Sequence, residues 1–341
     1  MKFHNSIKLF IRNKISDELR DFRHQLSREN PLKLLKYYKE KKKYKNDLKK
    51  NFSKDDFQYY ICIAAIVRDE ADYIAEWIEY HLYVGIQKFY IYDNGSEDNT
   101  KDILMPYMER GIVEYHYWPG KKREYYKYKT EKEKRRVQKK WHKKQHSAYF
   151  DAINRSKYST FWLAIIDLDE FIVPVSTRTI PEFLYDFEDE AGIEVFWLLY
   201  GNSGHIKKTN QLVIERFQYH SLSEYWENRL IKLIFNPRHV FLKRNHDAWF
   251  FDGRKAVNSN RFICGQPGYS ITHDKIRCNH YETKSFEEWL KRRKGILLKE
   301  SNSPAFIDEF NKEQSVRNVV KDDIIMFKYI EPIKKTLDTK Q

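Results

Sequence analysis

The sequence predicts an α/β protein with an open, mostly parallel sheet and flanking helices. Short apolar runs of strand length, typical of strands buried on both faces, alternate with stretches whose apolar residues recur at helical spacing. The clearest apolar runs are 61–67 and 159–166. With 341 residues, of which 41% are hydrophobic, the chain can fill the core of one large domain or of two modest ones.

The first fifty residues predict a basic helical extension. Their apolar positions fit two short amphipathic helices separated by Pro31, which can lie in a membrane interface or pack on their own domain. The composition changes after Ser53. We therefore expect an extension over 1–55, a main domain over 56–300 and a helical C-terminal tail over 301–341.

Strands and helices alternate after the first apolar run. The expected elements are, in order, a helix at 74–85, a strand at 88–92, a turn at 93–96, a helix that ends at Gly111 and a strand at 113–118. This alternation predicts right-handed βαβ units in a parallel sheet. Such sheets bind ligands at the carboxyl ends of their strands.

The next part of the chain is less regular. Residues 121–144 predict a charged helix that continues through 145–153. Beyond Pro174 the pattern is mixed, with apolar segments at 194–199, 212–217, 230–235 and 240–242. Ser285 and Glu288 have the spacing of a capping box, which predicts the start of a basic helix.

Two aspartates, Asp167 and Asp169, follow the apolar run at 159–166 directly. At an extended strand end they would point the same way, while Leu168 would point to the core. Two such carboxylates can share Mg²⁺ or Mn²⁺ and leave positions open for phosphate oxygens. The alternative is a pair of helix-capping or surface acids. A buried strand rarely ends in three acids without a partner charge, which favours the metal site.

A second polar group is expected at the same edge of the sheet. Asp93 and Asn94 begin a turn after a strand, and Asp93 can accept a hydrogen bond from a uracil N–H or a ribose hydroxyl. Arg68 and Glu70 follow the first strand, where Arg68 can face a phosphate. An ordinary Asn-Gly turn is the alternative. The presence of Asp167 in the same crevice favours contact of this turn with a nucleotide.

The net charge of +14 is concentrated in two segments. Residues 1–50 carry 16 Lys and Arg against 6 Asp and Glu, and residues 121–144 carry 13 against 3. The remaining chain is mildly acidic, so we expect no nucleic-acid partner. Two basic segments instead favour an anionic membrane surface, an anionic polymer or a protein partner, and a solvated helix face is the alternative.

Cysteine usage and hydropathy predict a cytoplasmic protein. Cys62, Cys264 and Cys278 are far apart and show no disulfide or thiolate-zinc spacing. The chain has no run of ~20 apolar residues and no secretory signal at its start. We expect a cytoplasmic location, with peripheral contact to the inner face of a membrane through the basic segments.

Several segments together resemble glycosyltransferase family 92 and bacterial family-2-like glycosyltransferases. They are AAIVRDEADYIAEWIEYHLYVGIQKFYIYDNGSEDNT, FWLAIIDLDEFIVP, YGNSGH followed by IERF, and HYETKSFEEWLKRRKG, and they extend from about residue 60 to residue 297. The resemblance implies a GT-A fold, a nucleotide-sugar donor such as a UDP-sugar, and a divalent cation. It also implies transfer of a hexose, galactose in characterised animal relatives, with inversion. The bacterial relatives suggest a surface-glycan acceptor.

The resemblance also assigns roles to residues. It implies a nucleotide-sugar half over 56–175 and an acceptor half over 176–300. Asp169 would be the main metal ligand, Asp167 would contact the metal or the ribose, and His280 would be the late metal ligand. The acceptor-side loop would be Gly201, Asn202, Ser203, Gly204 and His205. Inverting transfer needs a general base, for which Glu215 and Asp247 are candidates, each of which can equally be a salt-bridged structural acid.

Two features depart from the family pattern. The basic run at 121–144 is longer than expected, and residues 1–53 stand where relatives have a membrane anchor. Two other functions remain open at this point. Paired aspartates and a cation also serve nucleotidyl or phosphoryl transfer, and the basic run with its tyrosines also fits a non-catalytic protein that binds anionic polymers.

Overall fold

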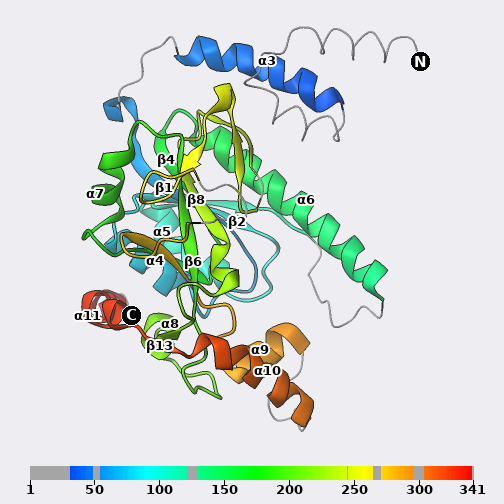
Figure 1. Cartoon of the computed structure of the whole chain (residues 1–341), viewed down its shortest axis with the longest axis vertical. Helices are drawn as coiled ribbons and strands as arrows, with labels where there is room; N and C mark the ends of the chain where they lie inside the picture. The colour runs from blue at the N-terminus through cyan, green and yellow to red at the C-terminus, as the bar shows by residue number, and fades with distance from the viewer. Residues whose placement is uncertain are drawn as a thin grey trace.

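The computed structural model describes residues 31–48, 54–120, 130–243, 245–263, 270–294 and 303–339. The predicted first helix of the extension and the segment 121–129 lie outside these ranges. The described chain forms a mixed α/β fold with a curled open sheet (Figure 1). The fold class predicted from the sequence is confirmed.

The main sheet contains nine strands among the described residues, eight of them in the order β3-β2-β1-β4-β8-β6-β12-β5, while β11 pairs with β6. Strands β3, β2, β1 and β4 are parallel, β8 is antiparallel to β4 and β6, β12 is parallel to β6, and β5 is antiparallel to β12. Their bounds are β1 Tyr59–Val67, β2 Lys88–Asp93, β3 Val113–Tyr117, β4 Thr160–Ile165, β5 Glu170–Pro174, β6 Gly192–Leu199, β8 Ile231–Phe235, β11 Ala256–Val257 and β12 Ile276–His280.

Helices cover both faces of this sheet. Alternate residues of β1 show why: Ile61 and Ile63 pack with α4, whereas Cys62 and Ala64 pack with α6. The helices are α4 Ile74–Tyr83, α5 Thr100–Glu109, α6 Glu131–Ser156, α7 Ile180–Leu184, α8 Val213–Arg216, α9 Phe286–Trp289, α10 Pro304–Arg317, α11 Asp323–Lys328 and α12 Ile330–Asp338. A run of 3-10 helix, η5, covers Trp226–Arg229, and a π-helix, η7, covers Leu290–Lys294. Small two-stranded sheets join β9 Val240–Lys243 with β10 Ala248–Phe250, and β7 Tyr219–His220 with β13 Val320–Lys321.

The C-terminal residues are helical, as expected, and they pack into the same core. Ile330 and Ile333 of α12 belong to the apolar cluster that contains α4. The pairing of β13 with β7 attaches this part of the chain a second time. Residues 303–339 are therefore packed against the sheet domain and form part of its core.

The second predicted helix of the extension is present as α3, Pro31–Leu48. Its buried residue Tyr44 stacks on Phe251 and hydrogen-bonds His239 at 3.0 Å. These partners follow the carboxyl end of β8 and so lie at the amino-terminal edge of β4. Figure 1 shows α3 at one end of the molecule and α9, α10 and β13 at the other.

Within the mixed region, the apolar segment 212–217 forms the short helix α8. Two local expectations differ from the structure. In the charged segment 121–144, the described helix begins at Glu131, where Thr130 and Glu133 form a capping box. The second difference concerns Asp167 and Asp169: β4 ends at Ile165, and the two acids lie in a tight turn instead of an extended strand end.

Candidate functional site

The topology brings seven strand ends to one edge of the sheet. The carboxyl ends of β1, β2 and β4 meet there because these strands are parallel. The carboxyl ends of β6 and β12 and the amino ends of β8 and β5 also reach it, because β8 and β5 run in the opposite direction. Most residues that the sequence singled out therefore lie on one face of the molecule, which we call the carboxyl edge.

The turn that holds the two aspartates is closed by the next acid, Glu170. The Glu170 carboxylate accepts the Asp167 N–H at 2.9 Å, and the Asp167 carbonyl accepts the Glu170 N–H at 3.2 Å. Leu168 is buried, as predicted. Hydrogen bonds within the turn thus replace the strand ladder that the sequence had suggested beyond Ile165.

A buried lysine neutralises one side of this turn. Lys232, on β8, lies 2.7 Å from Asp167 Oδ2 and 2.9 Å from Glu170 Oε2. Burial would lower the pKa of Lys232, but these two acids outweigh burial and raise it well above its usual range. Lys232 in turn outweighs the effect of burial on Asp167 and lowers its pKa. The pKa of Glu170, fully buried, is nevertheless raised to about 7.

The other side of the turn contains Asp169 and His280. His280 Nε2, at the end of β12, lies 3.6 Å from Asp169 Oδ1, and Arg292 Nη1 lies 2.9 Å from Asp169 Oδ2. The Tyr281 N–H also donates to the Asp169 carbonyl at 2.8 Å, so the backbone fixes the turn to β12. Burial alone would raise the pKa of Asp169, but His280 and Arg292 hold it well below its usual range. Asp169 raises the pKa of His280 against the effect of burial.

Glu70, expected on the rim, lies within electrostatic reach of this pair. Burial raises its pKa to about 7, Lys284 and Arg292 act in the opposite direction, and Asp169 adds to the rise. Within the described residues, no three His, Cys, Asp or Glu side chains are arranged so that together they could hold a metal ion. The structure brings Asp169 and His280 together and turns Asp167 toward Lys232.

The residues expected on the nucleotide side have two different environments. Arg68 is tied to the loops, because it donates to the carbonyls of Asn94 (3.1 Å) and Gly120 (2.8 Å). Asp93 accepts from the Ser96 N–H and from the Tyr115 hydroxyl, so both of its oxygens hold the turn. The Asn94 side chain is buried, and neither its oxygen nor its nitrogen has a partner among the described residues. A buried amide without partners is costly unless a ligand satisfies it.

The loop expected on the acceptor side is held by α10. Gln314 accepts the Asn202 N–H at 2.7 Å, and Asn318 accepts the Ser203 N–H at 2.9 Å. A Cβ atom on Gly201 would lie 2.1 Å from Asn318 Oδ1, which explains glycine at this position. Gly204 has a φ of +81°, and the His205 carbonyl accepts the Phe286 N–H at the start of α9. The loop 201–205 therefore lies between α9 and α10.

The two candidate bases differ in their surroundings. Glu215 Oε1 is 2.5 Å from Lys334 Nζ on α12, an ion pair of the kind expected for a structural acid. Asp247 lies in the loop between β9 and β10, and its buried Oδ1 has no partner among the described residues. The neighbouring His246 packs edge-on against Trp197, whose ring centroid lies 4.3 Å from that of His280. We call the turn formed by Asp167, Asp169 and Glu170 the acid turn. Through His246 and Trp197, Asp247 is the candidate base that lies nearer to His280 and this turn.

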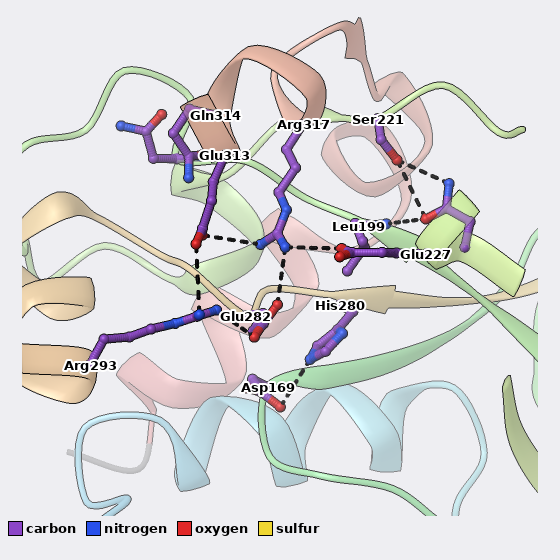
Figure 2. A network of polar contacts seen from close by, with 12 residues as sticks. Asp169, Leu199, Ser221, Glu227, His280, Glu282, Arg293, Glu313, Gln314 and Arg317 are labelled. Atoms are coloured by element: carbon purple, nitrogen blue, oxygen red, sulfur yellow. Dashed lines mark hydrogen bonds and ion pairs between the residues drawn. The ribbon is translucent and has the colours of Figure 1, made fainter. Parts of the chain in front are cut away.

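Sequence reasoning missed the ion-pair network around Glu282, close to His280 (Figure 2). Arg317, on α10 and only 4% exposed, lies 3.2 Å from Glu227 and 3.2 Å from Glu282. Arg293 lies 2.7 Å from Glu282, two residues after His280. The only sequence signal for these partners is Glu282 itself, since an acid next to a buried strand end needs a counter-charge. Lys232 had the same signal, as a lone cation within the apolar segment 230–235.

Together the fold and the site define a class: an α/β protein with a mostly parallel sheet whose carboxyl edge bears acids, cations and an unpartnered amide. The sequence model of "Glycosyltransferase family 92" matches residues 57–324. The chain therefore belongs to glycosyltransferase family 92, as the sequence resemblance predicted.

Individual relatives match shorter parts of the chain. A glycosyltransferase family 92 protein of rice, Oryza sativa subsp. japonica, is 27% identical over 129 residues, which is 37% of this chain and 18% of the relative. One of Arabidopsis thaliana is 25% identical over 127 residues, again 37% of this chain and 18% of the relative. The chain thus matches less than a fifth of the length of these relatives.

Solved structures are similar only distantly. Residues 1–349 of S. aureus TarS align with a TM-score of 0.34 and 10% identity over 68% of this chain and 64% of that one. Glucosyl-3-phosphoglycerate synthase from Mycobacterium tuberculosis, in complex with Mn²⁺, UDP and glucosyl-3-phosphoglycerate, aligns with a TM-score of 0.25 and 12% identity over 43% of this chain and 49% of that one.

Proposed function

We propose that the chain is a metal-dependent glycosyltransferase that moves a hexose from a UDP-sugar to a surface-glycan acceptor with inversion. The observation that carries the proposal is the pair Asp169 and His280, 3.6 Å apart at the carboxyl edge of a family 92 domain. Galactose is the first donor sugar to test, because the sequence resemblance points to it.

The donor set at the acid turn fits Mn²⁺ or Mg²⁺. One carboxylate oxygen and one imidazole nitrogen face each other at a separation longer than a hydrogen bond, and phosphate oxygens and water can complete such a site. We assign the metal to Asp169 and His280. A cation bound there supplies positive charge beside the leaving diphosphate. Asp167, which is ion-paired with Lys232, is assigned to a contact with the ribose or with the metal.

The remaining roles follow from the contacts. We assign the uracil to Asn94, whose buried amide offers one donor and one acceptor group. Asp93 and Arg68 shape the loops around it. Asp247 is our first candidate for the base that takes the acceptor hydroxyl's proton, ahead of Glu215, and the loop 201–205 is assigned to the acceptor.

The first experiment replaces Asp169 by Asn and measures UDP release from UDP-sugars in saturating Mn²⁺. We expect a loss of ~10²-fold or more, the usual cost of removing a key electrostatic stabiliser. The matched control is Asp252→Asn, because Asp252 pairs with Lys41 near α3 at the opposite edge. A variant that keeps more than about a tenth of the wild-type rate contradicts the assignment. Incorporation of nucleotides into a product, without release of UDP from UDP-sugars, would indicate nucleotidyl transfer.

The second experiment tests the metal directly. We expect His280→Ala to weaken Mn²⁺ binding by about an order of magnitude, measured by titration calorimetry without donor or acceptor. His273→Ala is the control, because His273 bonds the Trp197 carbonyl at 2.8 Å through Nε2 and is not assigned to the metal. Equal Mn²⁺ affinity in wild type and His280→Ala would place the second ligand elsewhere.

For the location we propose peripheral contact of residues 1–50 with an anionic membrane on its cytoplasmic side. None of the described helices has both the length and the apolar character needed to cross a bilayer. The support for the proposal is the charge of 16 Lys and Arg against 6 Asp and Glu. Flotation that is equal with neutral and with anionic vesicles at low salt would contradict it.

A further inference from the structure

The N-terminal half of α6, Glu131–Lys144, is separate in character from the rest of the helix, and we call it the α6 arm. The buried residues of α6 begin only at Gln145. The α6 arm contains eight Lys and Arg and two Glu. Its exposed cations are Lys132, Arg135, Arg136, Lys139, Lys140 and Lys143. Fourteen helical residues extend about 20 Å, so the arm reaches well beyond its point of attachment.

The arm begins beside the candidate site. Lys144 Nζ lies 4.8 Å from the centre of the Trp118 ring. The backbone N–H of Trp118 donates to the Asp93 carbonyl at the end of β2. Five residues further along α6, Tyr149 is buried close enough to Asp167 and Lys232 for both charges to act on it. The arm therefore starts at the carboxyl edge and runs outward from it (Figure 1).

The other basic segment is attached at the opposite edge. In α3, Asp47 lies 3.5 Å from Lys157 and accepts a hydrogen bond from Tyr158, just before β4 begins. Among the described residues, α3 and the α6 arm are thus not neighbours. This separation places their cations on two surfaces that can have different partners.

The composition of the arm argues against insertion into a bilayer. Its only large apolar residues are Val137 and Trp141, and Trp141 packs back against the apolar cluster of α6. A helix that lies in a membrane interface needs an apolar face directed away from its own domain. The arm instead offers cations over several turns, a pattern that matches an extended chain of negative charges.

We propose that the α6 arm binds a polyanionic acceptor glycan, a chain that carries repeated phosphate or carboxylate groups, and leads it to the carboxyl edge. The assignment of this polymer as the acceptor rests on the proposed glycosyltransferase function. A UDP-sugar bound at the carboxyl edge does not account for the exposed cations on the outer turns of the arm. Electrostatic attraction of this kind raises the local concentration of substrate and the rate of association.

The test compares two sets of four substitutions in the full chain. The arm variant is Lys132→Gln, Arg136→Gln, Lys139→Gln and Lys140→Gln. The control variant is Lys39→Gln, Lys42→Gln, Lys43→Gln and Lys45→Gln in α3, which are also exposed. Binding is measured to long-chain polyphosphate, to polygalacturonate and to neutral dextran over a range of salt concentrations. The first two polymers distinguish phosphate from carboxylate recognition.

We expect the wild type and the control variant to bind one or both anionic polymers and not dextran. The arm variant should bind at least tenfold more weakly at low salt. The magnitude of the slope of log affinity against log salt should fall by about 3, since each polymer charge that a cation neutralises contributes about 0.7 to it. Melting temperatures should be unchanged, because the replaced side chains are exposed. Equal weakening in both variants would overturn the proposal.

Two further measurements separate the remaining possibilities. If the arm variant loses binding to phosphatidylglycerol vesicles but keeps polymer binding, the arm is a membrane contact and the proposal is wrong. Hydrolysis of UDP-sugars without acceptor should be the same in the wild type and the arm variant. Absence of this hydrolysis in the wild type, with polymer binding intact, would refute the glycosyltransferase function and the acceptor role but leave the polyanion surface in place.

Discussion

Glu288 gives a quantitative test of how the α9 region is fixed to the sheet domain. Its carboxylate closes the capping box with Ser285 and accepts hydrogen bonds from Arg216 (2.9 Å) and the Tyr73 hydroxyl. Burial would raise its pKa, but Arg216, Ser285 and Tyr73 lower it to about 2 from an ordinary 4.5. Because one pKa unit corresponds to about 1.4 kcal/mol, the ionised carboxylate stabilises the fold by about 3 kcal/mol at neutral pH.

We therefore expect Glu288→Gln to lower the free energy of unfolding by about 3 kcal/mol at neutral pH. The pKa is depressed in the folded state, so the unfolded chain takes up a proton first as the pH falls. The stabilisation is full above 4.5 and is lost as the pH falls toward 2. The difference between wild type and variant should shrink over this range.

The assay is urea unfolding, followed by tryptophan fluorescence at several pH values, with the variant subtracted from the wild type. Subtraction removes the titration of the other carboxylates. Glu331→Gln on α12, an exposed acid, is the control and should change stability by less than about 0.5 kcal/mol. A difference for Glu288→Gln that stays constant between neutral pH and about pH 3 would refute the reasoning.

Three other variants test the carboxyl edge. Lys232→Met leaves Asp167 and Glu170 buried without their counter-charge, and we expect a loss of about 3–5 kcal/mol in urea unfolding, whereas a loss below about 1 kcal/mol would contradict the ion pairs. Arg317→Met should reduce turnover and Mn²⁺ affinity together, because Glu282 beside His280 loses a partner. Arg317→Lys should restore part of both. Unchanged Mn²⁺ affinity in Arg317→Met would limit Arg317 to a structural role. Arg292→Gln should strengthen Mn²⁺ binding in calorimetry without nucleotide, because Arg292 competes for Asp169, and weaker binding would show that the arginine supports the metal site instead.

Local sequence patterns predicted the elements well where the signal was local. The run at 61–67 falls within β1, Tyr59–Val67, and the run at 159–166 covers β4, Thr160–Ile165. The capping box at Ser285 is present with both of its hydrogen bonds. Each of these patterns depends on residues within a few positions of one another.

The sequence did not predict how charges pair across the fold. Lys232 is 65 residues from Asp167, and Arg317 is 35 residues from Glu282, so no local periodicity connects them. The spacing of Asp167 and Asp169 suggested side chains that point the same way. The turn closed by Glu170 gives them different partners. Only the order of the strands determines which strand end supplies each counter-charge.

The two aspartates of the acid turn differ in how their counter-charges are held, and this difference bears on function. Lys232 is buried and lies within reach of two acids, so it cannot leave Asp167 without exposing Glu170 to an unpaired, dry environment. Arg292 has a side chain that is 45% exposed and lies on a short π-helix, so it can exchange with solvent at lower cost. Asp169 can therefore give up its cation to a metal, while Asp167 keeps its own. This asymmetry favours Asp169 as the ligand that exchanges during turnover and Asp167 as a fixed contact.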